Sequence, residues 1–208
     1  MRRFLSLLLL SLLLSPLALA EALPAPNLPV GLQAPLQSRR SVRSFTGAPL
    51  TEQQMANLLW AAYGVNRENG KQTVPAALNR HAFTLYVLTR EGVLQYLPEG
   101  HQGKQVSPQN LLAQADGSGR LGPSAGAAIL LVGNPGIFDN LGAGAEKSAF
   151  YLGVEAGAIV QDIYLACAAQ GLGAVCCGSL NAEALSEALQ LPPDRRPLLT
   201  VVVGTPAP

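Results

Sequence analysis

The sequence predicts one α+β domain in which short strands surround a single long, apolar helix. Three observations carry this prediction. The chain has 208 residues, which is the size of one domain with short appendages. Hydrophobic residues make up 49% of it and charged residues 13%, so the chain can bury a substantial core. Several short segments rich in β-forming residues alternate with helical patterns, the longest of which spans residues 146–170.

The first twenty residues have the pattern of an export signal. Arg2 and Arg3 precede a leucine-rich run, and the small residues Ala18 and Ala20 fit cleavage after Ala20. We therefore expect a signal peptide over residues 1–20, no stable membrane span after its removal, and a periplasmic or secreted mature protein. An uncleaved membrane anchor is the alternative, and the arginine pair leaves a twin-arginine export route open beside the general one.

Charge and cysteine content exclude several classes of function. The 14 Lys and Arg residues nearly balance the 13 Asp and Glu residues, so no basic excess favours a nucleic-acid partner. The odd number of cysteines, Cys167, Cys176 and Cys177, does not predict a disulfide framework. With only His81 and His101 as further soft ligands, their spacing fits no zinc site, and we expect no metal.

The first half of the mature chain is expected to open with an extended lead-in. Residues 21–35 are rich in proline and alanine, and the domain is expected to span residues 36–208. Thr51 and Gln54 have the spacing of a capping box for a helix that ends at Gly64. A polar loop follows, and then a hairpin of two strands, residues 83–88 and 93–97.

The second half is expected to contain the central helix and the inner strands. Residues 108–115 are a short helix candidate, 117–126 a loop and 127–132 a buried strand. The helix at 146–170 is apolar nearly all round, which predicts burial in the core or a subunit interface. Gly153 and Gly157 allow another helix to pack closely against it. A strand at 174–177, a helix at 181–191 capped by Asn181 and a strand at 198–203 complete the domain.

Polar side chains that carry chemistry concentrate in the segment Ser38–Phe45. Arg39, Arg40, Ser41 and Arg43 place three guanidinium groups and a hydroxyl within five residues. Guanidinium groups offer paired donors that match phosphate oxygens, so the segment can form a phosphate cradle. A solvated basic turn is the alternative that composition alone leaves open.

This segment, read as Arg39-Arg40-Ser41-Val42-Arg43-Ser44-Phe45, resembles the opening element of the FMN-dependent nitroreductase family. Three further stretches are similar to family segments: LLWAAYGVNRENGKQTVPAALNR at 58–80, EAGAIVQDIYLACAAQGL at 155–172 and LLTVVVGTP at 198–206. The similarity covers residues 36–206, and the branch that it resembles most contains SagB-type dehydrogenases and exported relatives.

The resemblance implies a nitroreductase-like fold, with a central mixed or antiparallel sheet, flanking helices and a long buried helix at a dimer interface. It implies that Arg39, Arg40, Ser41 and Arg43 hold the FMN phosphate and nearby ribityl oxygens. Asn79 matches the asparagine that hydrogen-bonds the flavin, and Gly178 and Ser179 lie near its N5 edge. It also implies a homodimer with each flavin at the subunit interface. No side chain is expected to act as a catalytic nucleophile.

The function expected from this resemblance is that of an exported FMN-dependent oxidoreductase. Ping-pong electron transfer would run through the flavin to or from a small organic substrate. The electron donor, the acceptor and the direction of flow stay open. One alternative is a dehydrogenase that passes electrons to oxygen or a carrier, and another is a vicinal dithiol, Cys176-Cys177, that exchanges electrons with FMN. A non-catalytic exported protein that binds flavin or a small aromatic ligand is the alternative from a different class.

Four other residues receive structural interpretations. Glu155 and Asp162 lie seven apart on one face of the long helix, and we expect solvated or interface carboxylates there rather than a pair of catalytic acids. Tyr63 and Tyr164 are expected to be packing residues.

Overall fold

A computed structural model of the protein describes residues 20–25, 31–142 and 144–208. Its centre is a seven-stranded sheet in the order β1-β4-β3-β2-β5-β7-β6, in which all strand pairs are antiparallel. The strands are β1 (Ala20–Ala22), β2 (Phe83–Leu88), β3 (Val93–Leu97), β4 (Gln102–Ser107), β5 (Ala127–Gly133), β6 (Gly173–Cys177) and β7 (Arg196–Gly204). Apart from Ala20, the expected signal peptide lies outside the described residues.

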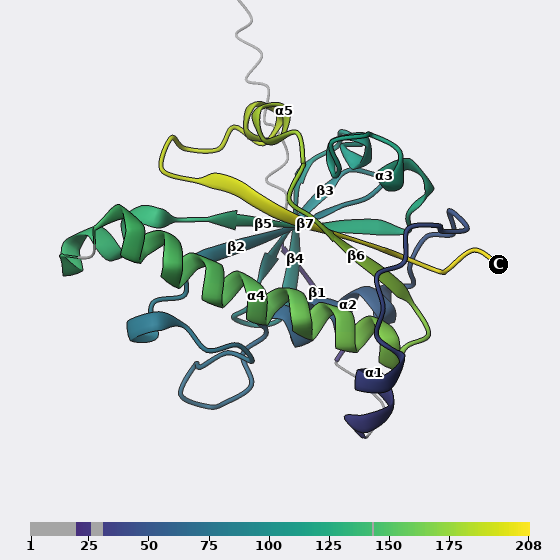
Figure 1. Ribbon diagram of the computed structural model, residues 1–208, viewed down its shortest axis with the longest axis horizontal. Helices are drawn as coiled ribbons and strands as arrows, with labels where there is room; N and C mark the ends of the chain where they lie inside the picture. The colour runs from purple at the N-terminus through teal and green to yellow at the C-terminus, as the bar shows by residue number, and fades with distance from the viewer. Residues whose placement is uncertain (1–19, 26–30, 143) are drawn as a thin grey trace, which may run out of the picture.

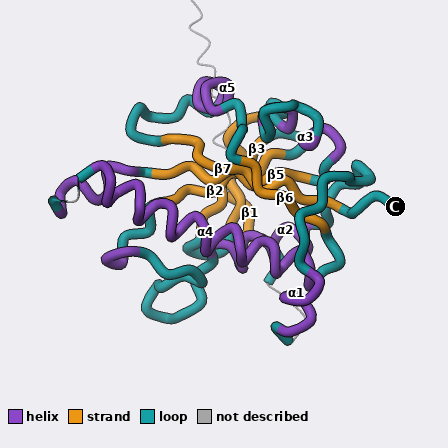
Figure 2. Tube along the Cα trace, in the orientation of Figure 1, coloured by secondary structure: helices purple, strands orange, loops and turns teal. Residues whose placement is uncertain are grey.

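Helices cover both faces of the sheet (Figures 1 and 2). They are α1 (Gln33–Ser38), α2 (Glu52–Tyr63), α3 (Leu121–Ser124), α4 (Ala145–Ala169) and α5 (Ala182–Ala188). Three 3₁₀ segments, Ala77–Asn79, Leu112–Gln114 and Pro135–Leu141, connect them. The predicted α+β class is confirmed, and the sheet is antiparallel rather than mixed.

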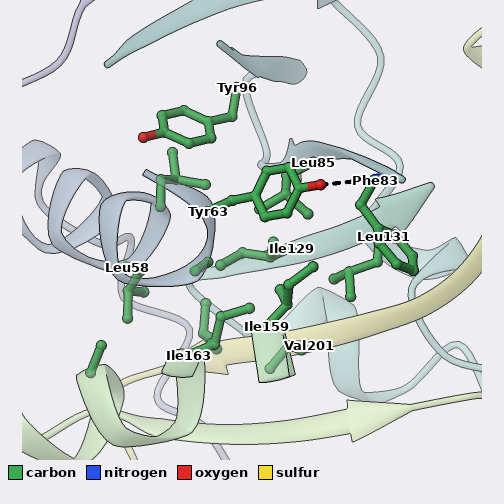
Figure 3. Close-up of a cluster of buried hydrophobic side chains, with 14 of the residues drawn as sticks. Leu58, Tyr63, Phe83, Leu85, Tyr96, Ile129, Leu131, Ile159, Ile163 and Val201 are labelled. Carbon is green, nitrogen blue, oxygen red and sulfur yellow. Dashed lines mark hydrogen bonds between the residues drawn. The ribbon is translucent and has the colours of Figure 1, made fainter. Parts of the chain in front are cut away.

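The core has two layers because side chains alternate across the sheet. Ile129 and Leu131 of β5 point toward α2 and α4, where they meet Leu58 and Ile159 (Figure 3). The intervening Leu130 points to the opposite face, where a second cluster is closed by residues of α5. Every residue of β5 is buried, as expected for a strand covered on both sides.

The local patterns predicted several elements correctly. Strands β2 and β3 have the predicted bounds, and the capping box of α2 is complete, with the Thr51 hydroxyl accepting from the Gln54 amide at 3.1 Å. The long helix begins and ends one residue before its predicted limits. Asn181 caps α5 as expected, although the helix ends at Ala188, three residues earlier than predicted.

Other elements differ from the prediction. Residues 21–35 contribute strand β1, which pairs with β4, and helix α1, rather than only an extended lead-in. Strand β4 was not predicted, because the hydrophobic alternation of a strand is absent from QGKQVS. The short helix expected at 108–115 is only the 3₁₀ turn Leu112–Gln114, and the expected loop at 117–126 contains α3.

Helix α4, expected to be buried in the core or a subunit interface, is buried along one face within a single chain. Leu152, Ile159 and Ile163 lie in the core, whereas the side chains of Phe150 and Val154 are 65% and 53% exposed. The length and hydropathy of α4 would also suit a membrane span, and among the described residues it is the one helix with that property. Its inward face lies on the sheet of this domain, so core packing explains the apolar residues on that face.

Candidate functional site

The arginine segment lies along the free edge of β6. Ser41 forms a parallel bridge with Ala174, and the Val42 amide donates to the Ala174 carbonyl at 2.8 Å. This approach requires glycine at position 173, since a Cβ atom there would lie 2.7 Å from Cβ of Val42. The segment is therefore held on the sheet by backbone pairing, and the side chains of Arg40 and Arg43 are exposed.

The hydroxyl of Tyr164, on α4, joins this segment to the sheet. It lies 3.1 Å from Oγ of Ser41 and accepts a hydrogen bond from the Cys176 amide at 2.9 Å. The guanidinium carbon of Arg39 stands 5.1 Å from the centroid of the same ring, within cation–π range. Tyr164 was predicted to be a packing residue, and its ring is indeed buried. A sequence can suggest that the ring is buried. It could not reveal the partners of the hydroxyl, because they lie on two other segments of the chain.

A pocket of about 450 Å³ opens beside this junction, within the size range of small-molecule sites. Ser38, Arg39 and Arg40 supply polar groups at its wall, and Tyr164 and Leu172 supply apolar surface. The described residues that line it include no Asp or Glu. Two guanidinium groups and a hydroxyl beside an apolar surface suit a ligand that carries a phosphate on a larger, less polar body.

The remaining residues of the predicted cradle follow the same edge. Ser41 contacts the pocket wall by its hydrogen bond with the Tyr164 hydroxyl. Arg43 lies close enough to Cys177 for its positive charge to oppose the rise in the pKa of that thiol. Gly178 and Ser179 follow directly after β6 and are exposed. Six of the seven predicted binding residues therefore lie along β6 or its continuation.

Asn79 is the one predicted binding residue that lies far from β6 within a single chain. Phe83, four residues after Asn79, pairs with Gly133 at one end of β5, whereas Ala174 is level with Ala127 at the other end. Six residues of strand and three strand spacings separate these points, which amounts to about 20 Å along the strands and about 14 Å across them. One copy of the chain does not bring Asn79 to the cradle.

Glu155 is the most buried carboxylate of the described chain, with an exposed fraction of 1%, which corrects the expectation of a solvated or interface residue. It accepts hydrogen bonds from the Tyr63 hydroxyl at 2.7 Å and from the Ala82 amide at 3.1 Å. Burial raises its pKa, although both hydrogen bonds oppose that rise. Tyr63, predicted to be a packing residue, thus has a specific polar partner.

Asp162 does not pair with Glu155. It lines a separate groove beside Trp60 and Leu165, and two helical turns separate it from Glu155 along α4. Burial raises the pKa of Asp162 to about 6. The two carboxylates are therefore not a pair of catalytic acids.

The geometry of β6 does not support a redox-active dithiol. Cys176 packs against the core layer under α4, whereas Cys177 lies in the layer on the opposite face of the sheet. Burial raises the pKa of both thiols, which keeps them in the unreactive protonated form. The two neighbouring cysteines are packing residues of a strand.

The fold and the site together place the protein in a structural class. Its members have an antiparallel sheet with a long helix across it and, at the edge strand, a basic pocket that suits a phosphate group. Residues 36–205 match the model of the nitroreductase family. The chain is 30% identical over 184 residues to a candidate nitroreductase of Methanocaldococcus jannaschii, covering 84% of this chain and 91% of that one. The protein therefore belongs to the nitroreductase family and has the oxidoreductase fold of that family.

Solved structures give the same assignment. The crystal structure of a candidate nitroreductase from Ralstonia eutropha JMP134 is similar with a TM-score of 0.82 and 30% identity, over 91% of this chain and 90% of the other. A candidate NADH oxidase from Clostridium acetobutylicum has a TM-score of 0.60 at 21% identity, over 83% and 87% of the two chains, and this likeness concerns the fold alone.

Proposed function

We propose that the protein is an exported, FMN-dependent oxidoreductase that acts on a small organic substrate by a ping-pong mechanism. The observation that carries the proposal is the pocket beside β6, where Arg39 and Arg40 stand next to the Tyr164–Ser41 junction. The donor set fits the FMN phosphate, and the apolar wall fits the rest of the cofactor. When bound, FMN supplies the electron transfer itself, while the chain provides binding and orientation.

In this proposal each part of the edge has a distinct role. Arg39, Arg40 and Ser41 bind the phosphate and the adjoining ribityl oxygens, and Arg43 adds positive charge further along β6. Gly178 and Ser179 present backbone amides, which stabilise negative charge on a bound ring system. No side chain acts as a nucleophile.

Asn79 reaches the cradle in a homodimer. Glu155, near the middle of α4, bonds to Ala82, while Tyr164, about 13 Å further along the helix axis, bonds to Ser41. A two-fold axis across the middle of α4 would place two copies of the helix antiparallel. It would thus bring the Asn79 end of one copy to the cradle of the other.

The outer face of α4 suits this arrangement. Phe150 and Val154 are exposed apolar residues, and a Cβ atom at Gly153 or Gly157 would meet nothing within 4 Å. An apolar stripe with small residues at its centre allows two helices to approach closely. Each flavin would then lie between subunits.

Export is proposed from the N-terminal pattern alone. The experiment is fractionation of cells that produce the full chain, followed by mass determination of the mature N-terminus. Recovery outside the cytoplasmic membrane with an N-terminus at Glu21 supports export and cleavage. A cytoplasmic protein that retains residues 1–20 contradicts both.

The cofactor assignment is tested by the visible spectrum of residues 21–208, before and after dithionite and after addition of FMN. Flavin bands that bleach on reduction support the proposal, and Arg39→Ala/Arg40→Ala should lose them. Arg120→Ala is the matched control, because Arg120 is an exposed arginine away from the pocket. A protein that binds no flavin contradicts the proposal, and one that binds flavin but reduces no acceptor favours the non-catalytic binding protein.

A further inference from the structure

The buried cluster around Glu155 has no role in the functions described so far. Three elements contribute to it: Tyr63 from the end of α2, Glu155 from α4 and the segment that enters β2. The Tyr63 hydroxyl donates to Glu155 at 2.7 Å. It accepts from the Phe83 amide at 3.1 Å (Figure 3). The Ala82 amide donates to both oxygens of Glu155, at 3.1 and 3.3 Å.

This cluster anchors a strained turn that contains Asn79. Leu78 and Asn79 have φ angles of 55° and 56°, in the left-handed region. Asparagine adopts this conformation readily, whereas leucine seldom does, so the strain lies at Leu78. Such conformations persist only where the surrounding structure holds them. The side chain of Asn79 is itself exposed. Three residues further along the chain, the Ala82 amide donates a buried hydrogen bond to Glu155, and this bond is the nearest buried anchor of the turn.

Oε1 of Glu155 accepts from both the Tyr63 hydroxyl and the Ala82 amide, and Oε2 accepts a second, longer contact from the Ala82 amide at 3.3 Å. Both the Tyr63 hydroxyl and the Ala82 amide point hydrogen atoms at the carboxylate, and an ionised carboxylate is the side chain that accepts on all sides. A proton on Oε2, or the amide nitrogen of a glutamine in its place, would put a donor against the Ala82 amide. The ionised form of Glu155 therefore fits these partners best.

His81 is a second titratable group, beside Tyr63, that faces this carboxylate. Its Nδ1 atom lies 3.7 Å from Oε1 of Glu155, is buried and has no hydrogen-bond partner among the described residues. Its ring packs edge-on against Tyr63, with the centroids 5.6 Å apart. Burial lowers the pKa of His81, and Glu99 opposes this effect. A proton on Nδ1 would give Glu155 a further donor, so the imidazole must be controlled for in any test of pH dependence.

We propose that ionised Glu155 is a positioning residue that holds Asn79 in place to bind FMN across the subunit interface. Protonation of this carboxylate would then set the acid limit of FMN binding. This inference rests on the proposed function. It gives Glu155 a role through Asn79, without contact between the carboxylate and the cofactor.

The pH dependence has a definite sign. Since burial raises the pKa of Glu155, the carboxylate takes up a proton at a higher pH than a surface glutamate does. As the pH falls through that pKa, the Ala82 anchor weakens, the turn at Asn79 loosens and FMN affinity decreases. Glu155→Gln imitates the protonated side chain and should have weak affinity at every pH.

The test is an FMN titration of the apoprotein, followed by flavin fluorescence, between pH 5 and 8. Wild type should lose affinity toward pH 5. Glu155→Gln should bind about tenfold more weakly at pH 8 and lose less affinity than wild type toward pH 5. The loss that remains is that of the FMN phosphate, whose second pKa is about 6. His81→Gln, which removes the imidazole titration, should keep the acid loss. Asn79→Ala should weaken binding, and Glu155→Gln should add nothing to it, since the carboxylate acts through Asn79.

The outcomes separate this inference from the proposed function. Wild-type affinity and an unchanged pH profile in Glu155→Gln would overturn the inference alone, as would effects of Glu155→Gln and Asn79→Ala that add fully. A wild-type protein that binds no FMN at any pH would overturn the proposed function as well. Hydrogen exchange at residues 77–83 then shows independently whether the carboxylate anchors the turn, because exchange should accelerate in a folded Glu155→Gln variant.

Discussion

Substitution of Gly173 by alanine tests how closely the arginine segment must approach the sheet. A Cβ atom at this position would lie 2.7 Å from Cβ of Val42, and 2.8 and 3.0 Å from its two methyl carbons. Carbon atoms prefer separations of about 3.5–4.0 Å, so Val42 would have to move by about 1 Å. The hydrogen bond from the Val42 amide to Ala174 opposes that movement.

The cost follows from overpacking, which is typically about 1–3 kcal/mol. If the segment moves to relieve it, the strain appears as weaker cofactor binding, by about 5- to 150-fold. If the segment stays, the strain appears in the free energy of unfolding. The assay is therefore a pair of measurements on Gly173→Ala: FMN titration of the apoprotein and denaturant unfolding.

Gly103→Ala is the matched control, because Gly103 is also a strand glycine. A Cβ atom there meets only side-chain carbons of Leu23 and Leu94, at 3.7 Å, which is ordinary contact. Its stability and FMN affinity should stay close to those of wild type. A Gly173→Ala protein that matches wild type in both measurements would refute the close approach of Val42 to β6.

Three further predictions follow from the same structure. Tyr164→Phe keeps the ring under Arg39 but leaves the Cys176 amide without its acceptor, so unfolding should require about 1–2 kcal/mol less free energy in denaturant titration. Because the pKa of Asp162 is about 6 in the folded protein and 3.8 in the reference state, the contribution of this group to stability should fall as the pH rises from 4 to 6. Asp162→Asn should abolish this fall, and the free energy of its unfolding at pH 8 should exceed that of wild type by about 1–2 kcal/mol, after allowance for the partial exposure of the group. Below pH 4 the stabilities of the variant and of wild type should converge. An unchanged pH dependence in the variant would contradict the assignment. Val154→Glu, on the outer face of α4, should yield monomers with weakened FMN binding in sedimentation velocity, whereas Val106→Glu, exposed on β4, should stay dimeric.

Local sequence patterns predicted the parts of the fold whose causes are local. The capping box of α2 depends on Thr51 and Gln54, three residues apart, and the hairpin of β2 and β3 depends on alternation and a tight turn. Strand β4 depends on neither. Its buried positions are Gly103 and Ser107, and it is a strand because β3 on one side and β1 on the other offer backbone partners.

The same distinction applies to the site. The arginines of residues 39–43 could be recognised because they are adjacent in the sequence. The partners of Tyr164 and Glu155 could not, since they lie 123 and 92 residues away, on Ser41 and Tyr63. The distance of Asn79 from the cradle follows from the order of strands in the sheet, which no local pattern encodes.

The most direct test of a two-subunit FMN site is a mixed dimer. One chain carries Arg39→Ala/Arg40→Ala and the other Asn79→Ala, with different affinity tags, and FMN bound per purified heterodimer is measured. Each parent homodimer should bind FMN weakly, while the heterodimer should regain one tight site, formed by the cradle of one chain and Asn79 of the other. A heterodimer without a tight site would contradict the claim that the site is shared between subunits.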